Sequence, residues 1–403
     1  QLLVTGTDQA ETITLSQSVG GIALTTSAGT QQFDGAFTSV VVYGFGGDDV
    51  IRLTHSVAAA AWIYAGMGDD SVFEAGTGAA VVFGEAGDDL LVSVGGGADA
   101  LYGGEGLDSF WADSADTVGD PSAAEATARS VHQFAEFYQP FSGKKSNPDY
   151  VPLEIDGQDI ADPTITSAAT RYDNFADRSL FVDGPQYDDI SQGGIGDCYY
   201  MATLSSLADS DPHILEQMIT PLGDGTFAMR FYRNNKEVYL RLDADLPVRG
   251  DGSLAYADFG PDGELWVPLA EKAYAYFRYD QNSYASLSGG WMTVTNEEIT
   301  GMPSGFTWTS GSTNAIYTVI SRALAAGQAV SLGTYYNASG PIVGSHAYTV
   351  RSVENTADGK FVTVYNVWGV DGRVWDLEPD DGLLRLTIHE IQDYFIAVVT
   401  STA

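Results

Sequence analysis

The first 118 residues repeat a short glycine- and aspartate-rich pattern, and this repeat constrains the fold more than any other feature of the sequence. Glycines allow tight turns and expose backbone carbonyls, so the pattern predicts regularly stacked turns. The copies align on Asp49, Asp70, Asp89, Asp99 and Asp108. The separations of these aspartates (21, 19, 10 and 9 residues) are close to one or two multiples of a nine- to ten-residue period. The apolar residues expected to point inward, two positions after each aspartate, are Ile51, Val72, Leu91, Leu101 and Phe110.

This repeat resembles the nonapeptide of RTX-type parallel β-rolls. The resemblance implies an all-β roll over residues 1–118, in which the aspartate of each turn reaches a cation shared with the next coil. Oxygen ligands at this density suit Ca²⁺, so we expect the five aligned aspartates to be calcium ligands. The alternative is that the glycines and aspartates form β-turns of an ordinary β-domain. Residues 11–15 and 39–43 are predicted to be flanking strands.

The overall charge limits the possible partners. The 403 residues include 54 acidic and 18 basic side chains, which gives a formal charge of −36. Nucleic acids and anionic membrane surfaces are therefore unsuitable partners, whereas bound cations are favoured because excess carboxylate repels itself unless it is neutralised. The sequence contains no run of about 18 uncharged apolar residues, so no membrane span is expected.

The cellular location is predicted from the repeats rather than from a targeting segment. Gln1 is not an initiator methionine, so we expect a fragment or a processed form, and a signal could lie upstream. A single cysteine excludes an internal disulfide and leaves the redox compartment open. Millimolar calcium outside cells would fill weak sites, so the repeats favour a secreted or cell-surface protein of a bacterium. The protease segments described below would by themselves suggest the cytoplasm.

The composition changes after Asp120, and we expect a domain boundary near residues 115–125. Ala124 to about Tyr138 has helical spacing and few glycines. We therefore interpret residues 119–178 as a linker and an N-terminal helical extension of the domain that follows. Residues 179–190 then lead into the loop that carries the only cysteine.

This cysteine, Cys198, stands at the start of a predicted helix that continues to about Leu207. Unpaired amides and the positive end of the dipole at a helix N-terminus favour the thiolate, which is the nucleophilic form. A nucleophilic cysteine also needs a base within hydrogen-bond reach and a group that orients the base. The alternative is an inert, buried cysteine that packs as a small apolar residue.

Five segments resemble signature segments of the calpain cysteine proteases, in the family's order and over about 200 residues. They are residues 192–198 (QGGIGDC), 264–275 (ELWVPLAEKAYA), 283–290 (SYASLSGG), 344–350 (GSHAYTV) and 366–369 (NVWG). The resemblance implies an α+β, papain-like core of two lobes. We expect a mostly helical lobe over residues 179–301 that carries the cysteine, and a β-rich lobe over residues 302–403 that carries a histidine and an asparagine.

The resemblance also implies a role for each site residue in hydrolysing the peptide bonds of protein or peptide substrates. Cys198 would attack as the thiolate, His346 would take and later donate the proton, and Asn366 would fix the imidazole tautomer. Gln192 and the backbone amide of Cys198 would stabilise the oxyanion. Trp368 would shield the contact between the histidine and the asparagine from water.

The residues themselves agree with these roles. His346 adjoins an apolar run that predicts a strand, and Asn366 follows a second predicted strand over residues 361–365. Adjacent strands of one sheet would bring the two side chains together, facing the cysteine helix across a cleft. Taken singly, His346 also fits a core histidine, Asn366 a turn residue and Gln192 a loop cap.

Two positions depart from the family pattern. Tyr199 replaces the tryptophan that usually follows the cysteine, and both aromatic side chains can line a cleft wall. Val367 replaces the proline that usually separates the asparagine from the tryptophan, which predicts a less restrained loop. No counterpart of the family's later domains follows the core, and no EF-hand spacing is present.

The resemblance implies calcium in the protease core as well, where it would align the two lobes and gate activity. The positions that match the first core site are Val182 and Gly184 through their carbonyls, and Asp189 and Glu264 through their side chains. A surface carboxylate pair beside a turn is the alternative. The second core site matches poorly, and its candidates, Asp371, Asp376 and Asp381, are left open.

Three functions compete. The first, which we prefer, is a calcium-dependent cysteine endopeptidase. The second is the same fold used for acyl transfer or as a self-cleaving maturation unit. The third is a catalytically silent calcium-binding or adhesion module, which the presence of all three catalytic residue types disfavours.

Overall fold

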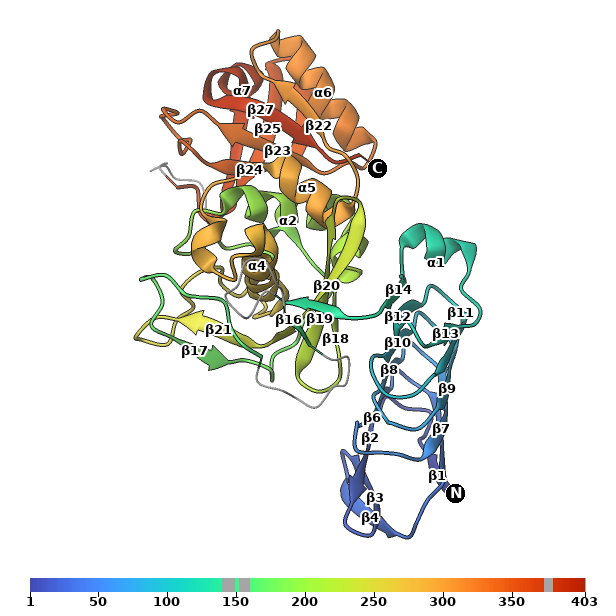
Figure 1. Ribbon diagram of the computed structural model, residues 1–403. Coiled ribbons are helices and arrows are strands. Elements are labelled where there is room, and N and C mark those ends of the chain that lie inside the picture. Colours follow the sequence, from blue (N-terminus) through green and yellow to red (C-terminus); the bar gives the residue numbers. More distant parts are fainter. Residues whose placement is uncertain (140–148, 152–159, 373–379, 403) are drawn as a thin grey trace. The chain divides into compact units, whose positions relative to one another are not determined.

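The computed structural model describes residues 1–139, 149–151, 160–372 and 380–402, and the chain forms two compact units. The first consists mainly of residues 1–138, and the second mainly of residues 161–220 and 229–402 (Figure 1). None of the helices in the described ranges is long and apolar enough to cross a membrane.

The first unit is a β-solenoid built from two sheets, which confirms the predicted parallel roll (Figure 1). One sheet is parallel throughout and contains, in spatial order, β1 (Leu2–Thr5), β5 (Ser39–Gly46), β7 (Ala60–Met67), β9 (Ala80–Ala86), β11 (Ala100–Glu105) and β13 (Thr117–Val118). The other contains β14 (Val131–Phe134), β12 (Ser109–Asp113), β10 (Leu90–Ser93), β8 (Ser71–Glu74), β6 (Val50–Leu53), β2 (Thr12–Ser18), β3 (Gly21–Thr26) and β4 (Gly29–Asp34). Only the β2–β3–β4 end of the second sheet is antiparallel.

Each full coil uses two copies of the repeat, one for each sheet. Val50, Ser71, Leu90 and Ser109 are register partners along the second sheet, so successive coils differ by 21, 19 and 19 residues. The side chains predicted to point inward are fully buried in the solenoid core, at Ile51, Val72, Leu91, Leu101 and Phe110. Each such burial contributes about 1.5–3 kcal/mol, which explains why the apolar position is kept in every copy.

The aligned aspartates lie at two edges of the solenoid. Four of them each precede a strand of the second sheet and lie at one edge of the solenoid. Asp99 precedes β11 of the first sheet, and its backbone N–H donates to Asp116 of the next coil at 2.9 Å. Its spacing of half a coil from its neighbours places it at the opposite edge.

The helix expected from Ala124 to about Tyr138 is shorter than predicted. The observed helix, α1 (Ala123–Ala128), begins with a capping box between Ser122 and Glu125 and ends at Arg129, which has a left-handed backbone with φ of 59°. The chain then forms β14, which pairs in parallel with β12. The solenoid therefore continues to Phe134, beyond the residue 118 at which the prediction ended it.

The part of the chain between residues 160 and 301 contains the helices of the second unit's first half. They are η1 (Tyr187–Asp189), α2 (Cys198–Ser210), α3 (His213–Glu216), α4 (Trp266–Phe277), η2 (Arg278–Asp280), η3 (Tyr284–Leu287) and α5 (Met292–Thr300). Its strands are β17 (Arg171–Asn174) paired with β21 (Asp245–Val248), and β18 (Ile219–Pro221), β19 (Thr226–Arg233) and β20 (Lys236–Asp243) in one sheet. A short pair, β15 (Phe137–Gln139) and β16 (Asp149–Val151), precedes this part.

The remaining chain forms a six-stranded antiparallel sheet with two helices. In spatial order its strands are β22 (Gly305–Trp308), β27 (Phe395–Thr400), β23 (Val330–Thr334), β24 (Ala347–Thr356), β25 (Gly359–Asn366) and β26 (Leu383–Thr387). The helices are α6 (Thr313–Ala325) and α7 (Ile388–Tyr394). Together these two halves give the α+β architecture that the sequence predicted.

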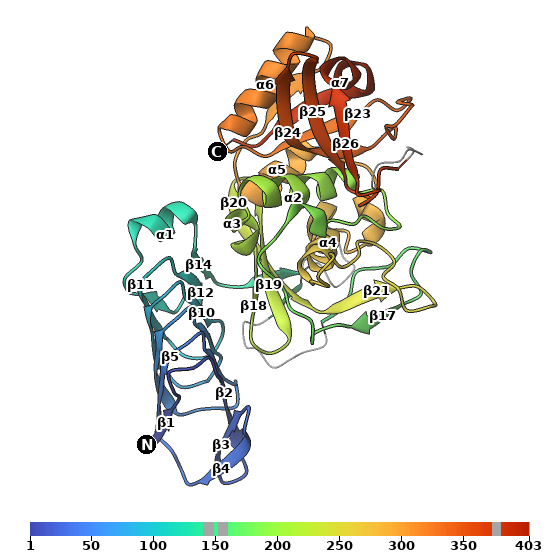
Figure 2. The ribbon, with the colours of Figure 1, turned by 180° about the vertical axis from the view of Figure 1, so that it is seen from behind.

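Side-chain alternation along β24 determines which elements cover the sheet. Tyr348 and Val350 join a core formed with α6 and α7 (Figure 2). Thr349 lies between them and points the other way, where its hydroxyl donates to the carbonyl of Ala202 in α2 at 3.2 Å. The first turn of α2 is thereby placed beside the start of β24, and these two chain segments carry the candidate nucleophile and the candidate base.

Candidate active site

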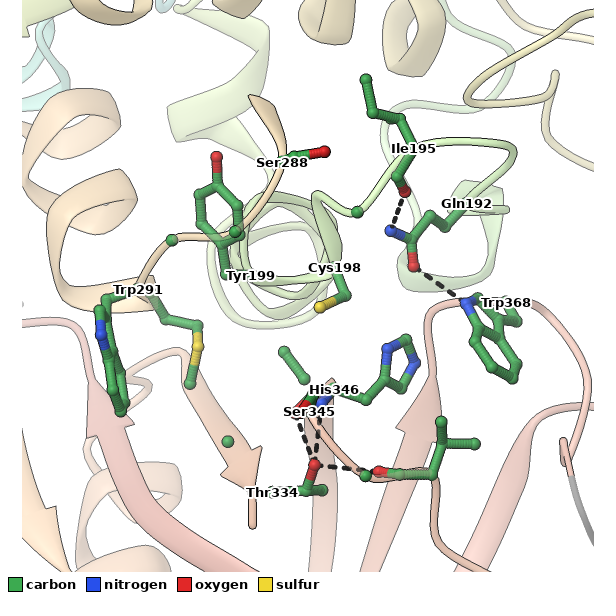
Figure 3. Close-up of a pocket in the computed structure, with 18 of the residues that line it drawn as sticks. Gln192, Ile195, Cys198, Tyr199, Ser288, Trp291, Thr334, Ser345, His346 and Trp368 are labelled. Carbon is green, nitrogen blue, oxygen red and sulfur yellow. Dashed lines mark hydrogen bonds between the residues drawn. The ribbon is translucent and has the colours of Figure 1, made fainter. Parts of the chain in front are cut away.

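A cleft of about 770 Å³ lies where the first turn of α2 meets the start of β24 (Figure 3). Its lining comes from segments far apart in the sequence: the loop before α2, residues 288–292, the turn before β24 and the loop after β25. Cys198, His346, Gln192 and Trp368 all line this cleft. Asn366 lies fully buried behind it. The structure therefore brings together all five residues predicted for the catalytic site.

The loop before α2 is held closely on both sides. A Cβ on Gly193 would lie 1.8 Å from the carbonyl oxygen of Tyr256, so only glycine fits there. The backbone N–H of Gln192 donates to the carbonyl of Val367 at 2.8 Å. The glycines of this loop thus allow a close approach of backbones, and the approach fixes the position of Cys198.

The thiol of Cys198 is protonated in this arrangement. Burial raises the pKa of Cys198 to about 11, and the negative charge of Asp197 adds to the rise. The backbone N–H groups of Ala347, Tyr199 and Cys198 itself act in the opposite direction, as amides at a helix start are expected to do. The first turn of α2 therefore favours the thiolate, but here desolvation outweighs it.

His346 and Asn366 form the contact that the sequence predicted. Register pairs Tyr348 with Asn366, which makes His346 a diagonal neighbour of Asn366 on adjacent strands. The Nε2 of His346 lies 2.8 Å from Oδ1 of Asn366. Asn366 Nδ2 donates to the carbonyl of Val370 at 2.8 Å, so Oδ1 is the atom that faces the imidazole. Nε2 is therefore the protonated nitrogen, and Nδ1 is left as the basic one.

The imidazole is neutral and shielded. Burial lowers the pKa of His346 to about 4, against the bond to Asn366, which raises it. The Trp368 ring lies over the imidazole, with ring centroids 4.7 Å apart, and this agrees with the predicted shielding. Within the described ranges, no hydrogen bond joins the Cys198 sulfur to the His346 ring, so base and nucleophile face each other as neutral groups.

The side chain of Gln192 is held within the loop rather than left free for an oxyanion. Its Nε2 donates to the carbonyl of Ile195 at 2.7 Å and to Oδ1 of Asp197 at 2.9 Å. Its Oε1 accepts from Nε1 of Trp368 at 3.0 Å (Figure 3). These three contacts fix which end of the amide carries nitrogen, and the nitrogen lies on the side of the loop that leads to Cys198.

The two departures from the family pattern have structural roles. Tyr199 forms part of the cleft lining, and its hydroxyl donates to the carbonyl of Leu287 at 2.9 Å. Its ring approaches Gly290 so closely that a Cβ there would lie 2.5 Å away. Val367 is fully buried, and its carbonyl accepts the Gln192 bond described above. The loop is thus restrained by packing where proline would have restrained it covalently.

Several site residues were not identified from the sequence. Thr334 of β23 accepts from the backbone N–H of His346 at 2.9 Å, and its hydroxyl contacts the His346 carbonyl at 3.1 Å. Trp291 lines the cleft and is 44% exposed. Neither residue carries a sequence signal, because their proximity to Cys198 arises only from the packing of β23 and α5.

The predicted core calcium site contains a buried carboxylate with no donor. Glu264 is 1% exposed, and neither of its oxygens makes a hydrogen bond of standard geometry. Burial and the nearby charge of Asp189 raise the pKa of Glu264 to about 7. The turn at Asp183 and Gly184 has left-handed backbone at both residues, with φ of 58° and 77°. Two close, desolvated carboxylates beside such a turn fit a hard cation, which would supply the missing positive charge.

Asp189 already uses one oxygen. Its Oδ2 accepts from the backbone N–H of Gln186 at 2.7 Å and from Nε1 of Trp266 at 2.9 Å. Among the described residues no group of three or more His, Cys, Asp or Glu side chains is arranged to hold a metal ion, so carbonyls and water would complete any such site. Of the candidates for the second core site, Asp376 lies outside the described residues.

The solenoid aspartates form a ladder between coils. The backbone N–H of Asp49 donates to Oδ1 of Asp70, that of Asp70 to Asp89, and that of Asp89 to Asp108, at 2.8–3.0 Å. In each of these four aspartates Oδ2 is buried without a hydrogen-bond partner. Burial raises the pKa of Asp89 to about 8 and those of Asp70 and Asp108 to about 6. Such a row of desolvated carboxylates is stable only when protons or cations neutralise it.

Comparisons with known proteins point to one family. A family model described as "Calpain family cysteine protease" matches residues 166–378. Calpain-2 catalytic subunit of Mus musculus is 27% identical over 212 residues, which are 48% of this chain and 30% of that protein. Calpain-8 of Homo sapiens is 29% identical over 208 residues, which are 47% of this chain and 29% of that protein. Calpain-type cysteine protease DEK1 of Zea mays is 28% identical over 207 residues, which are 47% of this chain and 9% of that protein. The matched segment thus spans less than a third of each of these relatives.

Proposed function

Because this chain belongs to the calpain family of cysteine proteases, we propose that it is a calcium-dependent cysteine endopeptidase that uses Cys198, His346 and Asn366. Membership establishes a cysteine peptidase domain, a hydrolase that acts on proteins. The triad, the calcium dependence and the activity of the whole chain are the proposed parts. The alternatives, self-processing or acyl transfer and a silent calcium-binding module, are outcomes of the tests below.

The proposed chemistry follows from the protonation states. His346 Nδ1 takes the proton from the Cys198 thiol, and the sulfur attacks the scissile carbonyl carbon. The oxyanion that forms is stabilised by the backbone N–H of Cys198, and by Nε2 of Gln192 once this nitrogen gives up its bond to Ile195 or to Asp197. When the C–N bond breaks, the leaving amine takes the proton from Nδ1. Water then attacks the thioester with His346 as the base, which releases the acid and restores the thiol.

The observation that carries this proposal is the 2.8 Å contact between Nε2 of His346 and Oδ1 of Asn366. This contact leaves Nδ1 as the free basic nitrogen of the His346 imidazole. His346 lines the same cleft as Cys198, which carries the chain's only thiol. A histidine that only packs in the core would not need a fixed tautomer, a tryptophan ring over its imidazole and a position in the cleft lining.

Casein hydrolysis by the wild type and by Cys198→Ala, each with and without calcium, tests the proposal. We expect hydrolysis only by the wild type and only in calcium. Absence of thiol-dependent hydrolysis in saturating calcium would exclude the endopeptidase. Self-cut fragments without cleavage of casein would favour the self-processing alternative instead.

Calcium is proposed to act on the core through Asp189 and Glu264 with the carbonyls of Val182 and Gly184. A bound cation would supply the positive charge that the Glu264 carboxylate lacks. η1, which carries Asp189, ends three residues before Gln192, so binding would restrain the loop that leads to Cys198. The neutral Cys198 thiol and His346 imidazole agree with an inactive resting state. Restraint of the loop by bound calcium would convert this state to the active one.

Calcium is also proposed to neutralise the solenoid aspartates. The unpartnered Oδ2 atoms of Asp49, Asp70, Asp89 and Asp108 support this proposal, as does the raised pKa of each of these carboxyls. Asp99 belongs to the other edge and would contribute to a separate site. The location outside a bacterial cell stays a proposal that rests on these sites, and fractionation of the source cells into secreted, surface and cytoplasmic proteins would test it.

A further inference from the structure

Three exposed aromatic side chains, here called the aromatic row, form a continuous series that starts in the cleft. Trp291 precedes α5 and lines the cleft, whereas Phe306 and Trp308 lie on β22, an edge strand of the six-stranded sheet. The rings of Trp291 and Phe306 have centroids 6.1 Å apart, and those of Phe306 and Trp308 have centroids 4.7 Å apart, both edge to face. The three side chains are 44%, 40% and 55% exposed, so the row presents apolar surface to solvent.

The register of the sheet connects this row to the candidate base. Trp308 pairs with Ala397, Ala397 pairs with Gly333, and Gly333 pairs with Ala347, which directly follows the candidate base. The indole of Trp291 stands over the middle of this line, since a Cβ on Gly333 would lie 3.9 Å from its Cζ3. Three strand spacings of about 4.8 Å place Trp308 about 14 Å from the start of β24.

The direction of a substrate in the cleft follows from the proposed chemistry. The imidazole of His346 gives its proton to the leaving amine, so the amine side of the scissile bond lies toward His346 and Trp368. Figure 3 shows these two side chains on one side of the Cys198 sulfur and Trp291 on the other side. The acyl side of the substrate therefore runs toward Trp291, and beyond it toward the other two rings of the aromatic row.

The chain segments that carry the row are uncharged. Residues 281–296 and 301–321 contain no Asp, Glu, Lys or Arg, although the whole chain has a formal charge of −36. A charged segment of a partner would find no ion-pair partner on these two segments. Aromatic rings that already meet edge to face offer further faces and edges to large apolar and aromatic side chains.

We propose that the aromatic row binds the acyl-side segment of the substrate and selects large apolar or aromatic side chains about four residues before the scissile bond. An extended peptide rises about 3.3 Å per residue, so about four residues cover the distance to Trp308. The inference rests on the proposed function and names the substrate class of that site. Because the row lies away from the reacting atoms, it binds ground state and transition state alike and acts on KM rather than on kcat.

Trp308→Ala tests the row with two peptide substrates in calcium. For a long peptide whose acyl side carries Phe, Leu and Trp, we expect KM to rise about tenfold, with kcat changed less than about twofold. For a short peptide that begins two residues before the scissile bond, KM should stay the same. Trp308→Phe should keep KM for the long peptide within about threefold of the wild type. Trp62→Ala in the solenoid, where the tryptophan is 39% exposed, is the matched control and should leave both substrates unaffected.

Two outcomes of these measurements would overturn the proposal. The first is an equal change of KM for the long and the short peptide, and the second is no change for either. Sedimentation of the wild type and of Trp308→Ala tests a second copy of the chain as the occupant, and we expect the two proteins to sediment alike. A dimer that Trp308→Ala abolishes, without an effect on KM, would assign the row to self-association instead.

A binding measurement separates this inference from the proposed function. Fluorescence anisotropy in calcium would compare a labelled peptide of about ten residues that contains Phe, Leu and Trp with a matched peptide that has serine in their place. Cys198→Ala, which cannot cleave either peptide, should bind the aromatic peptide about tenfold more tightly, and adding Trp308→Ala should remove the difference. Equal binding of the two peptides by Cys198→Ala would overturn the inference. If the wild type fails to cleave casein, the proposed function fails, whereas this measurement still decides whether the row binds apolar segments.

Discussion

At the scale of single residues, the site depends on how burial sets the protonation of two side chains, Cys198 and His346. Cys198 and His346 are both neutral, with pKa values moved apart to about 11 and about 4 by desolvation. Asn366 then decides which imidazole nitrogen is basic. Activation has to bring the thiol and Nδ1 together and stabilise the charge that proton transfer creates.

Substitutions of Asn366 test whether its side chain acts by fixing the tautomer of His346 or only by filling space in the core. Asn366→Ala should lower kcat by about 10², because the imidazole loses the acceptor that fixes its tautomer. Asn366→Asp keeps an acceptor opposite Nε2 and adds a negative charge, which raises the pKa of His346. Its kcat is expected to exceed that of Asn366→Ala, with the acidic limb of the pH–rate profile moved to higher pH. Equal kcat values for the two variants would contradict tautomer control.

His346 should make stability depend on pH in a defined direction. Its pKa falls from 6.5 in the unfolded chain to about 4 in the folded one. The unfolded state therefore binds more protons in this range, and the contribution of His346 to stability falls as the pH falls from about 6.5 to 4. Denaturant unfolding of wild type and His346→Gln across this range measures the difference. A difference in unfolding free energy that does not change with pH would contradict a buried, neutral imidazole.

At the scale of elements, the solenoid depends on glycines that let carboxylates pack against the backbone. A Cβ on Gly84 would lie 2.1 Å from Oδ2 of Asp89 and 2.7 Å from the carbonyl oxygen of Gly103. A Cβ on Gly103 would lie 1.9 Å from Oδ2 of Asp108. The same geometry recurs at Gly44, where a Cβ would lie 2.5 Å from Oδ2 of Asp49. Glycine thus stands five residues before Asp49, Asp89 and Asp108, whereas Ala65 stands five residues before Asp70.

Gly84→Ala should therefore destabilise the solenoid by about 1–3 kcal/mol, because neither the carboxylate nor the carbonyl can give way within the ladder. Gly46→Ala is the matched control, since the atom nearest to its Cβ would lie 3.6 Å away. We expect this control to stay within about 0.5 kcal/mol of the wild type. Thermal unfolding of both variants measures the contrast, and equal shifts would exclude the packing explanation.

The helix α4 connects the element scale to the site. It is buried along its whole length and carries Glu271, with Arg278 following its last residue. Its sequence was recognised from family resemblance, but the resemblance assigned no task to its glutamate. The packing of α4 against the chain at Ala257 gives Glu271 its hydrogen bond, because its carboxyl accepts from the backbone N–H of Ala257 at 3.0 Å.

At the scale of the whole molecule, two units of different chemistry share one chain. The solenoid stacks buried carboxyl groups beside its apolar core, whereas the protease unit is held by an apolar core between its sheet and its helices. Their stabilities should therefore respond differently to pH and to cations.

Calorimetry should resolve two transitions. In the folded solenoid the pKa values of Asp70, Asp89, Asp108 and Asp116 are raised to between about 6 and about 8. The folded state thus binds more protons than the unfolded one, and the solenoid loses stability as the pH rises from about 4 to 8 without calcium. Calcium at pH 8 should raise the Tm of this transition by mass action. A single transition, or a solenoid Tm that is independent of pH without calcium, would contradict this prediction.

The sequence by itself determined the features that depend on local pattern. The period of glycine and aspartate specified a parallel roll, and its apolar positions are the buried ones. Three of the five motifs contain the predicted catalytic residues. Four of these residues line one cleft (Cys198, His346, Gln192 and Trp368), and Asn366 lies buried behind it. The prediction failed where a local pattern has two outcomes: residues 124–138 have helical spacing, yet the helix ends at Ala128 and the chain continues into β14.

Only the tertiary structure decided what depends on distant neighbours. Burial, which no short pattern encodes, set the protonation of Cys198 and His346 and left Glu264 without a donor. The hydrogen bond from Trp368 to Gln192 joins residues 176 positions apart through the packing of two loops. Desolvation and contact between distant segments are properties of the assembled interior, and so the sequence could name the reacting residues but not their charge states.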